Sequence, residues 1–135
     1  MTRYPDWRTR LAAYLQDTAR RPFRPGAHDC VLWAAGARAA MTGIDPMADW
    51  RGCYSSIEEG LQLALQHGCA EPWLQVVVDL EEVPPAYAQV GDLALLDGED
   101  GVPALGVVQG AAIYVLHPRG TGTVPLTRAR RAWRV

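Results

Sequence analysis

The 135-residue sequence contains no lysine, and all 13 of its basic residues are arginine. Its formal net charge is only -2, and no run of like charges exceeds two residues. A nucleic-acid-binding domain usually carries a basic patch, and a membrane-surface segment carries a clear charge excess. The composition therefore predicts neither a nucleic-acid partner nor a charged membrane-binding surface.

Long apolar runs are also missing. No window approaches the roughly 20 apolar residues of a transmembrane helix, and the N-terminal segment 1–17 is charged rather than apolar. Cysteine is scarce: Cys30, Cys53 and Cys69 are an odd number at irregular spacing, which argues against a disulfide framework and favours a reducing compartment. We expect a soluble protein that is made in the cytoplasm and does not insert into a membrane.

The two halves of the chain have different patterns. The first half has helical spacing of apolar residues, and the second has short runs of strand-forming residues broken by glycine. This order predicts a single α+β domain over residues 1–135. Its expected parts are an N-terminal helix extension (1–21), a helical part with Cys30 (22–69), a connector (70–90) and antiparallel strands (91–135).

Three helices are predicted from their apolar faces and their ends. The first lies between Pro5 and Pro22, with an apolar face of Trp7, Leu11, Tyr14 and Leu15. The second runs from Cys30 to about Met41, capped by Asp29 and stopped by Gly43. The third follows the capping box of Ser56 and Glu59, with Ile57, Leu61, Ala64 and Leu65 on one face.

The remaining chain is predicted to be strands and loops. Residues 76–78 are apolar and β-branched, which is consistent with a short strand, whereas Pro84 and Pro85 require a loop. From Gly91 onward, the glycine-separated runs predict four or five antiparallel strands.

Cys30 stands at the predicted start of the second helix, directly after a loop rich in proline and glycine. Free backbone N–H groups and the helix dipole stabilise a thiolate there, which favours a cysteine nucleophile. The alternative is a buried cysteine behind an ordinary cap at Asp29, because cysteine is among the most buried residue types. The position alone leaves both interpretations open.

Metal binding is another interpretation of the same region. His28 and Cys30 form one His-x-Cys pair and His67 and Cys69 form a second, which together offer four ligands that zinc accepts. The spacing differs from the usual Cys-x-x-Cys knuckle, so chance pairing is the better explanation. We therefore expect no metal or other cofactor, with a metal-binding scaffold as a lesser alternative.

Four motifs follow one another in a recognisable order: "HDCVLWAA", "VGDLALL", "ALGVVQG" with the strands after it, and a closing "ARRAWRV". Together they resemble the NlpC-type branch of the papain-like cysteine peptidases and amidases, many of which cut peptidoglycan stem peptides. The opening and the second half are most similar to small relatives encoded among tail genes of bacteriophages and prophages. The resemblance implies a papain-like α+β domain, with helices packed on an antiparallel sheet.

The resemblance also implies roles for individual residues. Cys30 falls at the nucleophile position, and Asp92 falls at a strand-start aspartate with a structural role. The base histidine position is occupied by Ala104, whose methyl group cannot accept or donate the proton that a Cys-His mechanism moves. His117 and His28 are the candidate substitutes, and we expect Ala104 to lie opposite the Cys30 sulfur.

The missing base favours a structural role over catalysis. The function implied is a virion component of a phage tail tip or baseplate that keeps a hydrolase fold without its activity. Its partners would be other tail or baseplate proteins and peptidoglycan. The alternative is an active cysteine amidase or endopeptidase acting on peptidoglycan during infection.

A tail component must contact its neighbours, and aromatic and arginine side chains are typical interface anchors. The loop of residues 45–56 carries Trp50, Arg51 and Tyr54. We expect these three side chains to be partly exposed and to contact a partner.

Overall fold

The computed structural model describes residues 3–98 and 101–135. The helices are α1 (Trp7–Thr18), α2 (Cys30–Thr42), α3 (Ile57–Gln66) and α4 (Trp73–Val77), with short 3₁₀ helices η1 (Pro85–Tyr87) and η2 (Leu126–Arg128). The strands are β1 (Glu81–Val83), β2 (Leu93–Asp97), β3 (Pro103–Gln109), β4 (Ala112–His117), β5 (Gly120–Pro125) and β6 (Arg131–Arg134). The predicted α+β class, with helices first and strands last, is confirmed.

The described strands form one antiparallel sheet of six, in the order β1-β6-β2-β3-β4-β5. The strand missing from the prediction is β1, which lies in the expected connector and pairs with the last strand of the chain. The segment that was consistent with a strand at residues 76–78 is instead the end of helix α4 and the residue that follows it. A short apolar run does not distinguish a buried helix turn from a strand, because both are apolar on every side.

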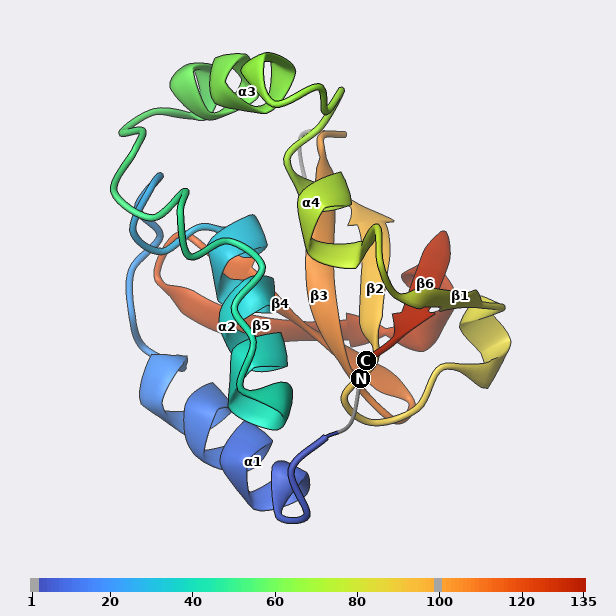
Figure 1. The fold of residues 1–135 in the computed structure, drawn as a ribbon. Helices are drawn as coiled ribbons and strands as arrows, with labels where there is room; N and C mark the ends of the chain where they lie inside the picture. The colour runs from blue at the N-terminus through green and yellow to red at the C-terminus, as the bar shows by residue number, and fades with distance from the viewer. Residues whose placement is uncertain (1–2, 99–100) are drawn as a thin grey trace.

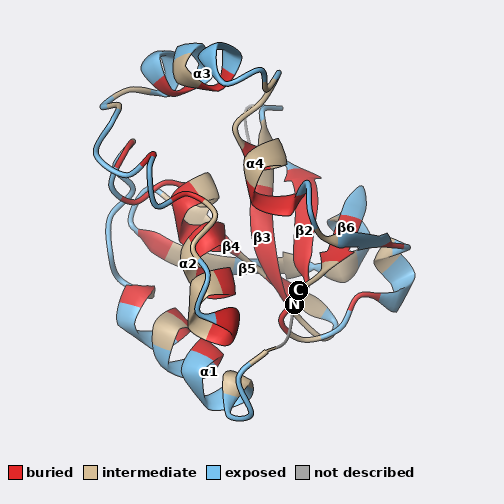
Figure 2. Cartoon of the chain, viewed as in Figure 1, coloured by how far each residue is buried: buried red, intermediate tan, exposed pale blue. Residues whose placement is uncertain are grey.

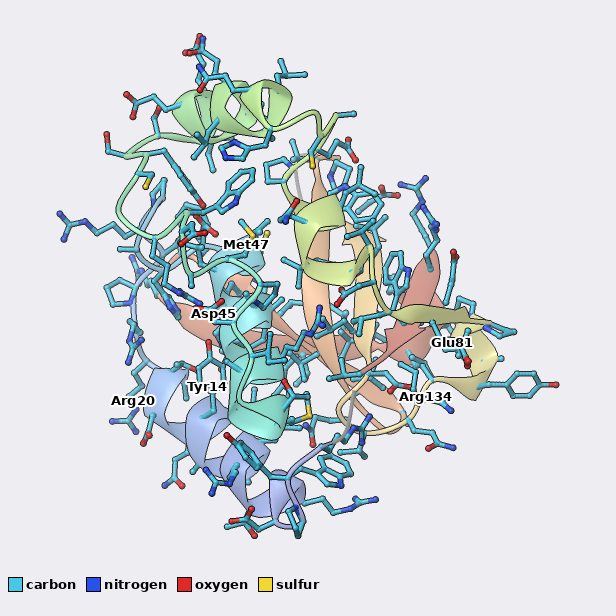
Figure 3. All side chains as sticks on the ribbon, viewed as in Figure 1. Tyr14, Arg20, Asp45, Met47, Glu81 and Arg134 are labelled. Carbon is cyan, nitrogen blue, oxygen red and sulfur yellow. The ribbon has the colours of Figure 1, made fainter. Side chains whose placement is uncertain are left out.

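Helix α2 packs on β3, with α1 and α4 on either side of it, so that these helices cover one face of the sheet (Figure 1). Its cap is the predicted one: the Asp29 carboxylate accepts from the Leu32 N–H at 2.9 Å, and Gly43 ends the helix with φ 82°. Tyr14 reaches from α1 towards α2 (Figure 3), and its hydroxyl donates to the Trp33 carbonyl at 2.8 Å. Gly36 permits this close approach, since an added Cβ would lie 2.1 Å from the Tyr14 hydroxyl.

Side chains of the sheet divide into two buried clusters. Leu93, Leu95, Leu105, Val107 and Trp133 join the helices in the larger cluster. Ala94, Leu96, Val108, Ile113, Val115 and Ala132 form a smaller cluster on the other face, partly covered by Leu126 and Ala129. Alternate residues of a strand point to opposite faces, so the cluster to which a residue belongs shows which face it occupies.

Helix α3 is mostly exposed, in contrast to α2 (Figure 2). The apolar face predicted for this helix is largely exposed, because Ile57, Leu61 and Leu65 are 51%, 43% and 66% exposed. Gly60 and Ala64 are the buried residues of this helix. The apolar stripe of α3 is genuine, but the helix lies beyond the end of the sheet (Figure 1).

The two ends of the described chain lie side by side (Figure 1), and Asp92 joins them. Its fully buried carboxylate accepts from the Gln89 N–H at 2.8 Å and pairs with Arg3 at 3.4 Å and Arg134 at 3.3 Å. These contacts are structural, as the resemblance implied for Asp92. None of the helices in the described part is both long and apolar enough to cross a membrane.

Candidate functional site

Cys30 is the first residue of α2 and faces the sheet, as predicted. Burial raises the pKa of its thiol to about 11. The backbone N–H groups of Leu105, Val31 and Cys30 itself act in the opposite direction, but they do not offset the loss of hydration. The thiol is therefore protonated at neutral pH, although it occupies a position that favours a thiolate.

The amide of Leu105 is available to the thiol because β3 is unpaired on one side at that point. Its pairing with β4 begins at Val107, two residues further along. Successive amides point to opposite sides of a strand, and the Val108 N–H, three residues on, donates to the carbonyl of Asp92, directly before β2. The Leu105 N–H therefore points away from β2 and meets the sulfur of Cys30.

Asp29 holds the loop before α2 in place as well as capping the helix. It is 4% exposed, and its Oδ2 accepts from the Gly26 N–H at 3.0 Å and from the Tyr54 hydroxyl at 2.5 Å. An added Cβ at Gly26 would lie 1.7 Å from the Tyr54 carbonyl, so only glycine fits there. The Asp29 carboxylate thus accepts three hydrogen bonds, from Leu32, Gly26 and Tyr54, and none of them comes from a histidine.

Ala104 does not lie opposite the thiol. It pairs with Leu96 of the smaller cluster, whereas Leu105 belongs to the cluster that contains α2. Because side chains alternate along a strand, the methyl group of Ala104 points away from α2 and Cys30. The expectation that Ala104 lies opposite the Cys30 sulfur is therefore wrong, because its side chain is on the other face of the sheet. A histidine at this position would also point away from the sulfur.

His117 is also on the far face. It follows Val115 by two residues and Ile113 by four, so it shares the face of these two members of the smaller cluster. Its ring lies over Gly122, where an added Cβ would come within 2.4 Å of it. The one-residue offset in the motif therefore places His117 on the face opposite Cys30. Its proposed role as a substitute base has no geometric support.

His28 lies on the loop before α2 and is 5% exposed. Burial lowers the pKa of its imidazole, and the nearby charge of Arg21 lowers it further. Its Nε2 is buried and has no hydrogen-bond partner among the described residues. The pKa of the Cys30 thiol is shifted by burial, by Asp29 and by backbone N–H groups. No imidazole of a described histidine is among these causes.

The pairs proposed as metal ligands do not come together. The His67 ring stacks on Trp50 with centroids 4.9 Å apart, and the Cys69 thiol donates to Gln75. Across residues 3–98 and 101–135, no three histidine, cysteine or acidic side chains are grouped so that they could hold a metal ion.

The loop of residues 45–56 agrees with the expected exposure at Arg51 and Tyr54, which are exposed and half-buried, but not at Trp50. Trp50 is 4% exposed and belongs to the core, so the prediction that it is exposed is wrong. Arg51 pairs with Asp45 at 2.7 Å and donates to the Leu32 carbonyl at 3.0 Å. Tyr54 is half-buried, and burial together with its bond to Asp29 raises the pKa of its phenol. These side chains hold the loop against α2.

A pocket of about 110 Å³ opens beside Cys30, walled by α3, α4 and the start of β3. Its lining is Asp29, Cys30, Val31, Tyr54, Ile57, Gly60, Leu61, Glu71, Pro72, Trp73, Val102 and Pro103. Most of these side chains are apolar, and the Glu71 carboxylate accepts a hydrogen bond from the Trp73 indole. Sites for drug-sized ligands usually enclose about 300–1,000 Å³, so this pocket has room for one group the size of a side chain.

A family model described as a domain of unknown function, DUF6950, matches residues 2–135. The chain belongs to this family. No curated protein matches the sequence. Because the DUF6950 match extends from the N-terminal helix to the last strand, α1 is part of the family's domain rather than an addition to it.

Two contacts of the site around Cys30 could not be predicted from the motifs. The bond from Tyr54 to Asp29 joins residues 25 positions apart, and the contact of Leu105 with Cys30 is made by a backbone amide. The glycine at position 26 was the one available signal for the first contact, since a Pro-Gly pair marks a turn and glycine permits close approach of another backbone.

Proposed function

We propose that this chain is a non-hydrolytic, papain-like domain that serves as a structural component of a bacteriophage tail tip or baseplate. The protein is made in the host cytoplasm and is carried in the virion, where it contacts neighbouring tail proteins. The papain-like assignment is supported by a cysteine that begins a central helix packed on an antiparallel sheet. The tail assignment comes from the motif resemblance alone.

The environment of Cys30 is the observation that carries the non-hydrolytic proposal. A cysteine nucleophile reacts as the thiolate and is usually activated by a nearby base. Here burial holds the thiol protonated, and its interactions are with Asp29 and backbone amides. The residues of β3 that share the α2 face near the thiol are Pro103 and Leu105, and neither can move a proton.

Incubation with purified peptidoglycan tests this proposal. Wild-type protein and Cys30→Ala should both release no muropeptides or free stem peptides, as measured by liquid chromatography with mass spectrometry. Cys53→Ala is the matched control, because it removes an exposed thiol instead. Release by wild type and Cys53→Ala but not by Cys30→Ala would contradict the proposal and support the active amidase.

The virion assignment needs a separate experiment. Tail particles purified from an induced culture that encodes the chain should contain it at a fixed ratio to the major tail protein, as measured by quantitative mass spectrometry. A chain that is present in the lysate but absent from purified particles would contradict a structural role in the tail.

A further inference from the structure

A second pocket, of about 270 Å³, lies between α1 and the far strands of the sheet. Its lining is Ala12, Leu15, Gln16, Ala19, Gln109, Tyr114 and Thr121, and it shares no residue with the pocket beside Cys30. Helix α1 is fixed against β5 here, because the Thr121 N–H donates to the Ala19 carbonyl at 2.9 Å. The pocket is therefore part of the fold rather than a gap between separate segments.

The two walls of this pocket have different chemistry. The α1 wall is largely apolar and contains Ala12, Leu15 and Ala19, with Gln16 beside them. The wall from the sheet carries the amide of Gln109, the phenol of Tyr114 and the hydroxyl of Thr121, each from a different strand. A ligand that fits must have an apolar face and hydrogen-bonding groups.

Three of the polar side chains are available to a ligand. Within the described residues, the side chains of Gln16, Gln109 and Tyr114 make no hydrogen bond to the rest of the protein. The Thr121 hydroxyl has only a long contact, 3.5 Å, with the Ala19 carbonyl. An amide offers both donors and acceptors, and a phenol or hydroxyl offers each as well, so the set can bind several hydroxyl groups at once.

Among the described residues, no charged side chain lines this pocket. An anion or a cation would lose hydration on entry and find no opposite charge among the lining residues to compensate it. The volume lies just below the usual range for small-molecule sites, which corresponds to one six-membered ring with its substituents.

From these observations we propose that the pocket between α1 and β3–β5 binds a neutral sugar ring. The C–H groups of a pyranose pack on the α1 wall, and its hydroxyl groups bind Gln16, Gln109, Tyr114 and Thr121. This inference does not depend on the function proposed for Cys30.

An NMR titration of the ¹⁵N-labelled full chain with methyl β-D-glucopyranoside tests the site. The backbone amide signals of Ala19, Gln109 and Thr121 should shift together, with an apparent Kd in the millimolar range. Gln109→Leu and Tyr114→Phe, which keep size and shape, should each weaken binding about fivefold or more. Gln66→Leu is the matched control, since it lies on the exposed side of α3 and lines neither pocket.

Three ligands of the same ring size check the chemistry. Cyclohexanol offers one hydroxyl, glucuronate is an anion and glucosamine is a cation, and each should bind more weakly than the neutral glucoside. Equal binding of cyclohexanol would show an apolar cavity without sugar recognition, and tighter binding of either charged sugar would contradict the neutral assignment. Absence of localised shifts at about 100 mM glucoside would overturn the proposal.

Discussion

Helices α2 and α3 both begin at a side chain that caps the first turn, yet α2 is buried and α3 is largely exposed. Asp29 caps α2 and also binds Gly26 and Tyr54, so that the cap is tied to two other segments of the chain. Ser56 caps α3 at 3.1 Å, and the reciprocal bonds of Glu59 go to Ser55 next to it. The cap of α2 is part of the tertiary structure, whereas the cap of α3 is local.

The same difference applies to the apolar residues. Leu32 in the first turn of α2 is fully buried, but Leu61 in α3 is exposed at the rim of the Cys30 pocket. A helical apolar stripe shows that one side of a helix prefers to be covered. It does not show whether another part of the same chain covers that side, and the described residues leave the stripe of α3 largely exposed.

The largest effect is expected at the loop between the two helices. Trp50→Ala should lower the free energy of unfolding by about 3–5 kcal/mol, because it empties a large core site. Urea denaturation followed by circular dichroism measures the change. A loss below about 1 kcal/mol would show that Trp50 is not a core residue, as an interface role would require.

A matched pair of leucines compares the two helices directly. Leu32→Ala should cost about 2–5 kcal/mol, whereas Leu61→Ala should cost less than about 1 kcal/mol because its side chain is already in contact with water. Both values come from the same denaturation experiment. Equal losses for the two variants would mean that α3 is as well packed as α2.

The caps should differ by a smaller amount. Asp29→Ala removes a cap and two further hydrogen bonds, so we expect a loss of about 2–4 kcal/mol. Ser56→Ala removes a single local cap and should cost about 1 kcal/mol. Tyr54→Phe separates the contribution of the tertiary bond from that of the cap, since it removes only the hydrogen bond to Asp29. A loss of unfolding free energy near zero would show that this bond adds nothing to stability.

Much of the local structure could be predicted from the sequence. The starts of α2 and α3 follow from Asp29 and Ser56, whose side chains bind the amides three residues on. Strands β2 to β6 follow from the glycine-separated runs of the second half. These features depend on neighbours along the chain, which is why a pattern predicts them.

Tertiary features were harder to predict. The strand β1 has three residues and is defined only by its pairing with β6. The side on which Ala104 lies depends on register, which a motif does not determine to one residue. The burial of Trp50 and the exposure of Leu61 depend on which elements pack against the core in the folded structure. Composition carries no information about that packing.

The smallest effect concerns pH. Burial lowers the pKa of His28, so the folded state binds a proton less readily than the unfolded state. Stability is therefore full above the ordinary histidine pKa of about 6.5 and declines as pH falls below it. His28→Gln should reduce this decline, as measured by urea denaturation between pH 7 and pH 5. An unchanged pH dependence would show that His28 does not titrate differently in the two states.

The most direct test of the account is the alkylation of Cys30 as a function of pH. A Cys53→Ser/Cys69→Ser variant leaves Cys30 as the single thiol, and mass spectrometry follows its reaction with iodoacetamide while circular dichroism confirms that the protein stays folded. We predict almost no reaction at pH 7 and a rate that rises towards a midpoint near pH 11, whereas the urea-unfolded chain should react with a midpoint near the ordinary thiol pKa of about 8.5. Rapid alkylation of the folded protein at pH 7 would show a stabilised thiolate and would contradict the non-hydrolytic account.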